Sequence, residues 1–119
     1  MFGVLIANAW SADNPAHIEE YIYYVAGKEK VDITKALAIA KCESRLRKDV
    51  IRDSKNDLTK TSDDEYSVGI FQINLIAHKT VTKEQALNPF FNINLAIDQL
   101  AKENWGMWKN CYEKIKVMI

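Results

Sequence analysis

Two Asn-Pro dipeptides, Asn14-Pro15 and Asn88-Pro89, constrain the fold most strongly because each predicts where a helix begins. Asparagine is a favoured N-cap, and proline suits the first helical position, where its missing N–H is not needed. After the dipeptides, apolar residues recur at helical spacing: Ile18, Tyr21, Ile22 and Val25 in the first case, and Ile93, Ala96, Ile97 and Leu100 in the second. We therefore predict one helix over about 15–28 and a second that starts at Pro89.

Two further helices have recognisable starts. One is capped by Asp32 or Thr34, and the other, a short helix through Ala86, is capped by Thr80 or Thr82. The expected buried positions of the first are Leu37, Ile39, Ala40 and Leu46.

The chain between the second predicted helix and the short helix through Ala86 has no helical pattern. Residues 47–65 are polar and predict a long loop with, at most, a hairpin, whereas residues 67–74 form a short apolar island. A last helix is expected near 109–117. In the link before it, we interpret Trp108 as a buried core residue rather than as an exposed ring that stacks on a sugar. With so little strand content, we predict a mainly α-helical fold with a short β region.

The chain has 119 residues, enough for one domain with a modest core. Residues 15–119 are expected to form that domain. Residues 1–14 are expected to be either an N-terminal arm or the remnant of a signal peptide, because the apolar start ends in an Ala-x-Ala pattern at Ala9. No segment has the length of a membrane-spanning helix, so we expect no stable membrane insertion.

Charge and cysteine content narrow the function classes. Sixteen basic residues balance sixteen acidic ones, which argues against a non-specific nucleic-acid binder. A local basic run is expected to be a solvated loop or helix end: Arg45, Arg47, Lys48 and Arg52. No ligand spacing predicts a metal site, and no motif predicts a cofactor. Taken alone, Cys42 and Cys111 are either two free thiols of a cytosolic protein or one bridge of an exported protein.

Glu43 interrupts the apolar stripe of its predicted helix. It follows Ala40, Ile39 and Ala36 by three, four and seven residues, which places it on the same helical face. Burial and the unfavourable C-terminal pole of the helix both disfavour its charged form, so its pKa is expected to rise. A carboxylic acid that keeps its proton near neutral pH can protonate a glycosidic oxygen. The alternative is a surface glutamate on a frayed last turn.

The island Ser67-Val-Gly-Ile-Phe-Gln-Ile-Asn74 is the second candidate for chemistry. Gly69 permits positive φ or a close backbone approach. The amides of Gln72 and Asn74 suit the hydroxyl and N-acetyl groups of a sugar, and we expect at least one of them to face a cleft. A core strand with incidental amides is the alternative explanation.

Four fragments in this order resemble the soluble lytic transglycosylase domain. They are Ala38-Ile-Ala-Lys-Cys-Glu-Ser44, Ser67-Val-Gly-Ile-Phe-Gln-Ile-Asn74, Asn88-Pro-Phe-Phe-Asn-Ile93 and Trp105-Gly-Met-Trp-Lys-Asn-Cys111. The Cys-Glu-Ser start and the Trp-Gly-x-Trp-x-x-Cys finish are also similar to resuscitation-promoting factors, which are secreted bacterial relatives with a lysozyme-like core. The resemblance spans about residues 18–112.

This resemblance implies a single lysozyme-like α+β domain with a glycan cleft. Glu43 matches the family's catalytic glutamate, and the residues expected to bind substrate are Ser67, Gln72, Asn74 and Asn92. Cys42 and Cys111 match a pair that is bridged in the secreted relatives. The implied partner is the glycan strand of peptidoglycan, and the chain is expected to act as a monomer that is secreted, periplasmic or associated with the cell wall.

The resemblance leaves several activities open. A lytic transglycosylase would cleave the β-1,4 bond between N-acetylmuramic acid and N-acetylglucosamine with Glu43 alone. A hydrolytic muramidase would recruit a second carboxylate, for which Asp63, Asp64 and Glu65 are nearby in sequence. Ser67 stands where animal lysozymes carry that carboxylate, which favours the transglycosylase.

Two further alternatives lie outside catalysis. A glycan-binding or assembly module would keep the cleft without turnover. A cytosolic helical interaction domain would have free thiols. One departure from the family pattern is Arg45, which replaces the glycine that follows Glu-Ser.

Overall fold

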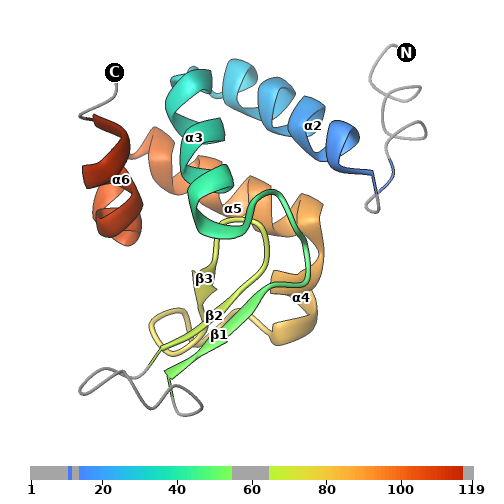
Figure 1. The fold of residues 1–119 in the computed structure, drawn as a ribbon, viewed down its shortest axis with the longest axis vertical. Helices are drawn as coiled ribbons and strands as arrows, with labels where there is room; N and C mark the ends of the chain where they lie inside the picture. Colours follow the sequence, from blue (N-terminus) through green and yellow to red (C-terminus); the bar gives the residue numbers. More distant parts are fainter. Residues whose placement is uncertain (1–10, 12–13, 55–64, 117–119) are drawn as a thin grey trace.

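The computed structural model describes residues 11, 14–54 and 65–116 (Figure 1). The expected signal-peptide remnant at the N-terminus lies almost wholly outside the described residues, and so do Asp63 and Asp64. The elements are α2 (Pro15–Lys28), α3 (Ile33–Ser44), β1 (Ile51–Asp53), β2 (Tyr66–Val68), β3 (Ile73–Asn74), α4 (Lys83–Leu87), α5 (Pro89–Ala101), the 3₁₀ helix η2 (Trp105–Trp108) and α6 (Lys109–Lys116). The predicted mainly helical fold with a short β region is confirmed.

The helices begin at the residues that the sequence indicates. The side chain of Asn14 accepts a hydrogen bond from the N–H of Ala16, and the side chain of Asn88 accepts from those of Phe90 and Phe91. Of the alternative caps, the structure uses Asp32 for α3 and Thr82 for α4, where Thr82 and Gln85 form a reciprocal capping box.

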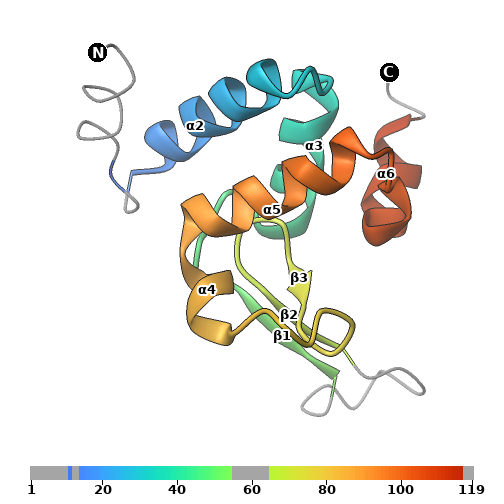
Figure 2. The same ribbon diagram turned by 180° about the vertical axis from the view of Figure 1, so that it is seen from behind.

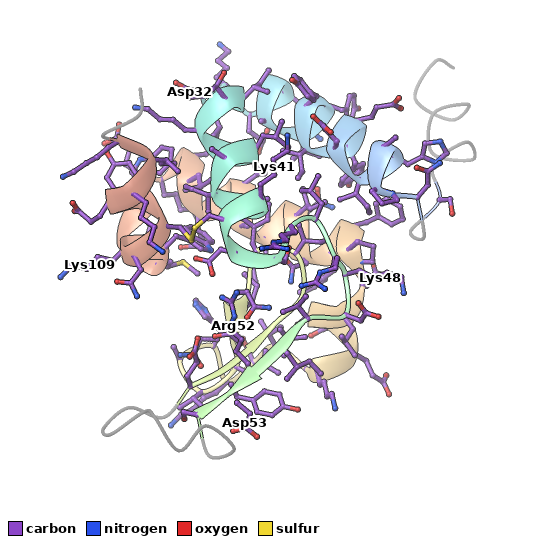
Figure 3. All side chains as sticks on the ribbon, in the orientation of Figure 1. Asp32, Lys41, Lys48, Arg52, Asp53 and Lys109 are labelled. Carbon is purple, nitrogen blue, oxygen red and sulfur yellow. A yellow bond between two sulfur atoms is a disulfide. The ribbon has the colours of Figure 1, made fainter. Side chains whose placement is uncertain are left out.

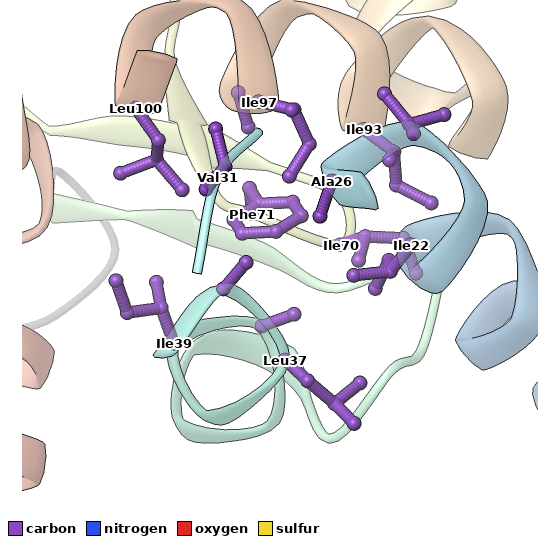
Figure 4. Close-up of a cluster of buried hydrophobic side chains, with 14 of the residues drawn as sticks. Ile22, Ala26, Val31, Leu37, Ile39, Ile70, Phe71, Ile93, Ile97 and Leu100 are labelled. Atoms are coloured by element: carbon purple, nitrogen blue, oxygen red, sulfur yellow. The ribbon is translucent and has the colours of Figure 1, made fainter. Parts of the chain in front are cut away.

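The core lies between α2, α3 and α5, with the turn after β2 inserted from below (Figures 1 and 2). Phe71 occupies its centre and is fully buried among side chains from all three helices (Figure 4). The Trp108 ring packs edge-on against Phe71 with ring centroids 5.9 Å apart, and its Nε1 donates to the Phe71 carbonyl. Trp108 is therefore a core anchor, as predicted.

The sheet is small and antiparallel, in the order β1-β2-β3. Part of the polar segment predicted as a loop is strand β1, which pairs with β2 in the manner of a hairpin. Ile51, Val68 and Ile73 are cross-strand neighbours, and Val68 and Ile73 are fully buried. Because neighbouring residues along a strand point to opposite faces, the residues next to them form the other, polar face of the sheet.

Helix α3 ends in an unusual backbone conformation. Arg45 and Leu46 have φ values of 56° and 63°, which is the left-handed region. A helix commonly ends this way, but the residue there is usually glycine because it has no Cβ to clash. This explains why the family pattern has glycine at the position of Arg45.

Replacing Arg45 with glycine should therefore stabilise the protein. We expect Arg45→Gly to raise the free energy of unfolding by about 0.5–1 kcal/mol, the relief of left-handed strain less the entropy that glycine adds to the unfolded chain. Urea denaturation would measure it. Arg45→Ala is the matched control, because it removes the guanidinium but keeps the strain. An equal gain in both variants would contradict the explanation.

A disulfide joins Cys42 of α3 to Cys111 of α6, with the Cα atoms 5.9 Å apart. The bridge implied by the sequence resemblance is therefore present. It ties the C-terminal segment to the turn of α3 that carries Glu43, across a sequence separation of 69 residues.

Removing this bridge should be costly, because it closes a long loop in the unfolded chain. We expect the double variant Cys42→Ser, Cys111→Ser to lose about 4 kcal/mol of unfolding free energy on the loop-entropy model. Reduction of the parent protein should lower its denaturation midpoint to that of the variant and leave the variant unchanged. Equal stability of the oxidised and reduced parent would show that the bridge contributes nothing.

Candidate active site

Glu43 lies in the last turn of α3, one residue before the helix ends at Ser44. The neighbours on its helical face, Ala36, Ile39 and Ala40, are fully buried, so the predicted apolar stripe is real. The Glu43 side chain is only 13% exposed. This rules out a glutamate on a frayed, solvated helix end.

The surroundings of Glu43 tune its proton affinity. Burial raises the pKa of Glu43 from its ordinary 4.5 to about 7. The cation of Arg52 opposes this rise, the carboxylate of Glu65 adds to it, and Lys114 opposes it more weakly. Arg52 Nη1 lies 3.4 Å from Glu43 Oε1, and the side chain extends from β1 beneath the end of α3 (Figure 3).

The polar face of the sheet carries a row of side chains at the level of Arg52. Arg52 is the register partner of Ser67, and Ser67 is the register partner of Asn74. Directly opposed residues in an antiparallel pair project from the same face, so this row lies on the face from which Arg52 reaches Glu43. The sheet therefore brings the predicted residues Ser67 and Asn74 onto the side that faces the end of α3.

Each member of the row is held in place. Ser67 is 3% exposed, and its Oγ donates to Glu65 Oε2 at 2.9 Å. Asn74 is half-buried, and its Oδ1 accepts from the backbone N–H of Ile76 at 3.0 Å. Because Asn74 Oδ1 is engaged within this turn, the side-chain nitrogen is the polar atom suited to an incoming acceptor.

Gln72 sits on the turn between β2 and β3 with φ of 53°, a strained value for a non-glycine residue. Its Nε2 donates to the carbonyls of Val50 and Gly69, at 2.9 Å and 3.0 Å. Its Oε1 is buried without a hydrogen-bond partner, which is unusual because a buried acceptor without a partner costs free energy. This oxygen is the atom of Gln72 whose hydrogen-bonding capacity is unused.

Asn92 requires a correction. It is fully buried, its Nδ2 donates to the carbonyls of Val68 and Ala86, and its Oδ1 accepts from the N–H of Phe71. All of its hydrogen-bonding groups are used inside the protein. Asn92 therefore supports the turn that carries Gln72 and does not line a glycan surface.

Gly69 explains why that support fits so closely. Its φ is +84°, and a Cβ there would clash with the Ala86 carbonyl oxygen and with the side-chain amide of Asn92. Glycine is thus needed both for the conformation and for the close approach, as the sequence pattern suggested.

Ser44 is a residue whose role the sequence did not reveal. It is 3% exposed, and its Oγ contacts the Ile70 carbonyl at 2.7 Å and the Ala40 carbonyl at 3.3 Å. The bond to Ile70 fastens the end of α3, beside Glu43, to the turn after β2. A serine in the last turn of an apolar helix is the one signal that could have indicated this role, but its partner lies 26 residues away in sequence.

Within residues 11, 14–54 and 65–116, no group of three or more His, Cys, Asp or Glu side chains is arranged to hold a metal ion. In that same part of the chain, no helix has both the length and the apolar character needed to cross a membrane.

A largely buried glutamate at a helix end beside a small antiparallel sheet, in a mainly helical domain, fits a lysozyme-like α+β protein. The model of the family described as "Lysozyme like domain" matches residues 21–110, and the chain belongs to that family. Comparisons with curated proteins and with solved structures gave no significant match. Family membership indicates a glycosidase-type, peptidoglycan-related activity, and together with the disulfide it points to a location outside the cytoplasm.

The raised pKa of Glu43 implies that the free energy of unfolding depends on pH. Because the folded pKa lies above the unfolded one, the folded state binds more protons between pH 4.5 and 7, so stability falls as pH rises through that window. We expect Glu43→Gln to be more stable than the parent by roughly 2–3 kcal/mol at pH 8, and to match it near pH 4.5.

Denaturation midpoints of the two proteins, measured between pH 4 and 8, would test this prediction. Glu20→Gln, the same chemical change at an exposed position of α2, is the control and should not alter the pH dependence of the parent. A difference between the parent and Glu43→Gln that does not vary with pH would contradict the raised pKa.

Proposed function

We propose that this chain is a peptidoglycan lytic transglycosylase in which Glu43 is the catalytic acid and base. The bond attacked is the β-1,4 linkage between N-acetylmuramic acid and N-acetylglucosamine. The glycan strand would run between the end of α3 and the polar face of the sheet. The observation that carries the proposal is the pKa of Glu43, about 7, on a side chain that is 13% exposed.

That pKa suits a residue that has to give and then take a proton. Near neutral pH about half of the molecules carry the proton, so protonated Glu43 is available to donate to the glycosidic oxygen. The C1–O bond then breaks, its electron pair stays on the departing oxygen, and positive charge develops at the muramyl anomeric centre. Glu43 is left as a carboxylate, and the nearby Arg52 stabilises that charged form.

In the second step, the muramyl unit forms an intramolecular ring. The carboxylate of Glu43 accepts the proton of the muramyl C6 hydroxyl while its oxygen forms a bond to C1. This gives a 1,6-anhydro end and returns Glu43 to its protonated form. One residue can serve both steps because burial and the charge of Arg52 oppose each other and hold its pKa near the working pH.

Neutral polar groups on the polar face of the sheet and on the turn between β2 and β3 would suit an N-acetylated sugar. The unpartnered Gln72 Oε1 fits an amide N–H, and the side-chain nitrogen of Asn74 fits a carbonyl or hydroxyl oxygen. We therefore keep Gln72 and Asn74 as proposed substrate contacts, whereas Ser67 acts on the site through Glu65. As a peptidoglycan enzyme, the protein would work in the periplasm or at the cell wall.

The proposal predicts that Glu43→Gln folds but does not cleave. The amide is nearly isosteric and avoids a buried charge, yet it cannot donate an acidic proton, so cleavage should fall by at least about 100-fold. Mass spectrometry of digested, purified peptidoglycan would measure the anhydro-muramyl ends. Unchanged cleavage by the variant would contradict the assignment of Glu43, and an intact glycan after incubation with the parent would favour a binding module.

A further inference from the structure

Among the described residues, Glu65 is a second carboxylate that acts on Glu43, and hydrogen bonds fix its backbone beside the sheet. It precedes β2 and is fastened to the chain after β1: the N–H of Ser54 donates to the Glu65 carbonyl at 2.8 Å, and the N–H of Glu65 donates to Ser54 Oγ at 2.7 Å. These two bonds extend the β1–β2 pairing by one step. The backbone of Glu65 is therefore held as part of the sheet.

The Glu65 side chain lies on the polar face of that sheet. Its Oε2 accepts a hydrogen bond from Ser67 Oγ, and Ser67 is the register partner of Arg52. Arg52 in turn reaches Glu43. Glu65 and Arg52 are thus neighbours on one face, one bringing a negative and the other a positive charge to the same glutamate.

We propose that Glu65, held by Ser67, is a second catalytic carboxylate that activates water, so that the protein also hydrolyses the bond that it cleaves by transglycosylation. The inference rests on the proposed function. Lysozyme-like enzymes that use water place a second carboxylate near the acid. In this chain the position expected to carry it is Ser67, whose hydroxyl instead positions the carboxylate of Glu65, two residues earlier.

The hydrolytic branch shares its first step with the transglycosylase reaction. Glu43 donates its proton to the glycosidic oxygen, and the C1–O bond breaks with its electron pair on that oxygen. A water molecule then bonds to C1 through its oxygen, and Glu65 takes the proton that the water loses. The muramyl unit ends as a free reducing end, and proton exchange with solvent returns Glu43 to its acid form and Glu65 to its carboxylate form.

Glu65→Gln separates the two branches, because it removes the base for water but leaves Glu43 in place. We expect reducing ends to fall by at least about 100-fold, while 1,6-anhydro ends change much less. Purified peptidoglycan is the substrate, and digests are reduced with borohydride before mass spectrometry. Reducing ends then gain two hydrogens, whereas anhydro ends remain one water lighter.

Two control variants test whether the effect depends on the Glu65 carboxylate and its position. Glu20→Gln makes the same change on the exposed face of α2 and should give the parent's product ratio. Ser67→Ala keeps the Glu65 carboxylate but removes the hydrogen bond that Ser67 donates to it, and should lower reducing ends in the same direction by a smaller factor. Thermal unfolding of each variant reports whether it is folded. If Glu65→Gln does not fold, Ser67→Ala provides the test instead.

The outcomes distinguish the inference from the proposed function. Anhydro ends alone from the parent, or an unchanged product ratio in Glu65→Gln, would overturn the role of Glu65 and leave the transglycosylase intact. No product of either kind from the parent would overturn the proposed function and this inference with it.

A second readout does not depend on turnover. The groups that face Glu43 are Arg52 of β1, Glu65 before β2 and Lys114 of α6, and Glu65 alone among them disfavours its ionisation. An NMR titration of the Glu43 carboxyl carbon should therefore show a lower pKa in Glu65→Gln than in the parent. An unchanged pKa would mean that the two carboxylates do not face each other, and the inference would fail.

Discussion

The hydrogen bond from Ser44 to the Ile70 carbonyl is the contact on which the rest of the site depends. It joins the end of α3, where Glu43 lies, to the turn that places Phe71 in the core and carries Gln72. Both partners of this hydrogen bond are held by further contacts. The disulfide holds α3 to α6, and Asn92 of α5 holds the turn and α4. Glu43 is buried because these connections bring α3 down onto the sheet.

A buried carboxyl would simply stay protonated if nothing opposed its desolvation. Here the cation of Arg52 opposes it at 3.4 Å, and the pKa of Glu43 is about 7, lower than burial alone would make it. The pKa of Glu43 near neutrality therefore follows mainly from a balance between burial and one charge on a neighbouring strand. The same sheet brings Glu65 to Glu43, so the register of β1 and β2 decides which charges the acid experiences.

Local signals in the sequence located the helices and Glu43. Asn14 and Asn88 begin their helices by bonding to the next few residues, and the stripe that buries Glu43 is readable from helical periodicity alone. Long-range contacts were not readable. Asn92 looked like a glycan ligand, but it bonds to Val68 and Phe71, which lie 24 and 21 residues away in sequence. The effect of Arg52 on Glu43 depends on the register of a hairpin that the polar sequence allowed but did not define.

The pH dependence of kcat/KM for peptidoglycan cleavage by the parent protein tests the central claim most directly, because it reports the protonation state that the free enzyme needs. If protonated Glu43 is the acid, the rate falls above a pKa of about 7, by tenfold for each further pH unit. A rate that stays constant or rises between pH 7 and 9 would mean that protonated Glu43 is not required, and the account of this site would be wrong.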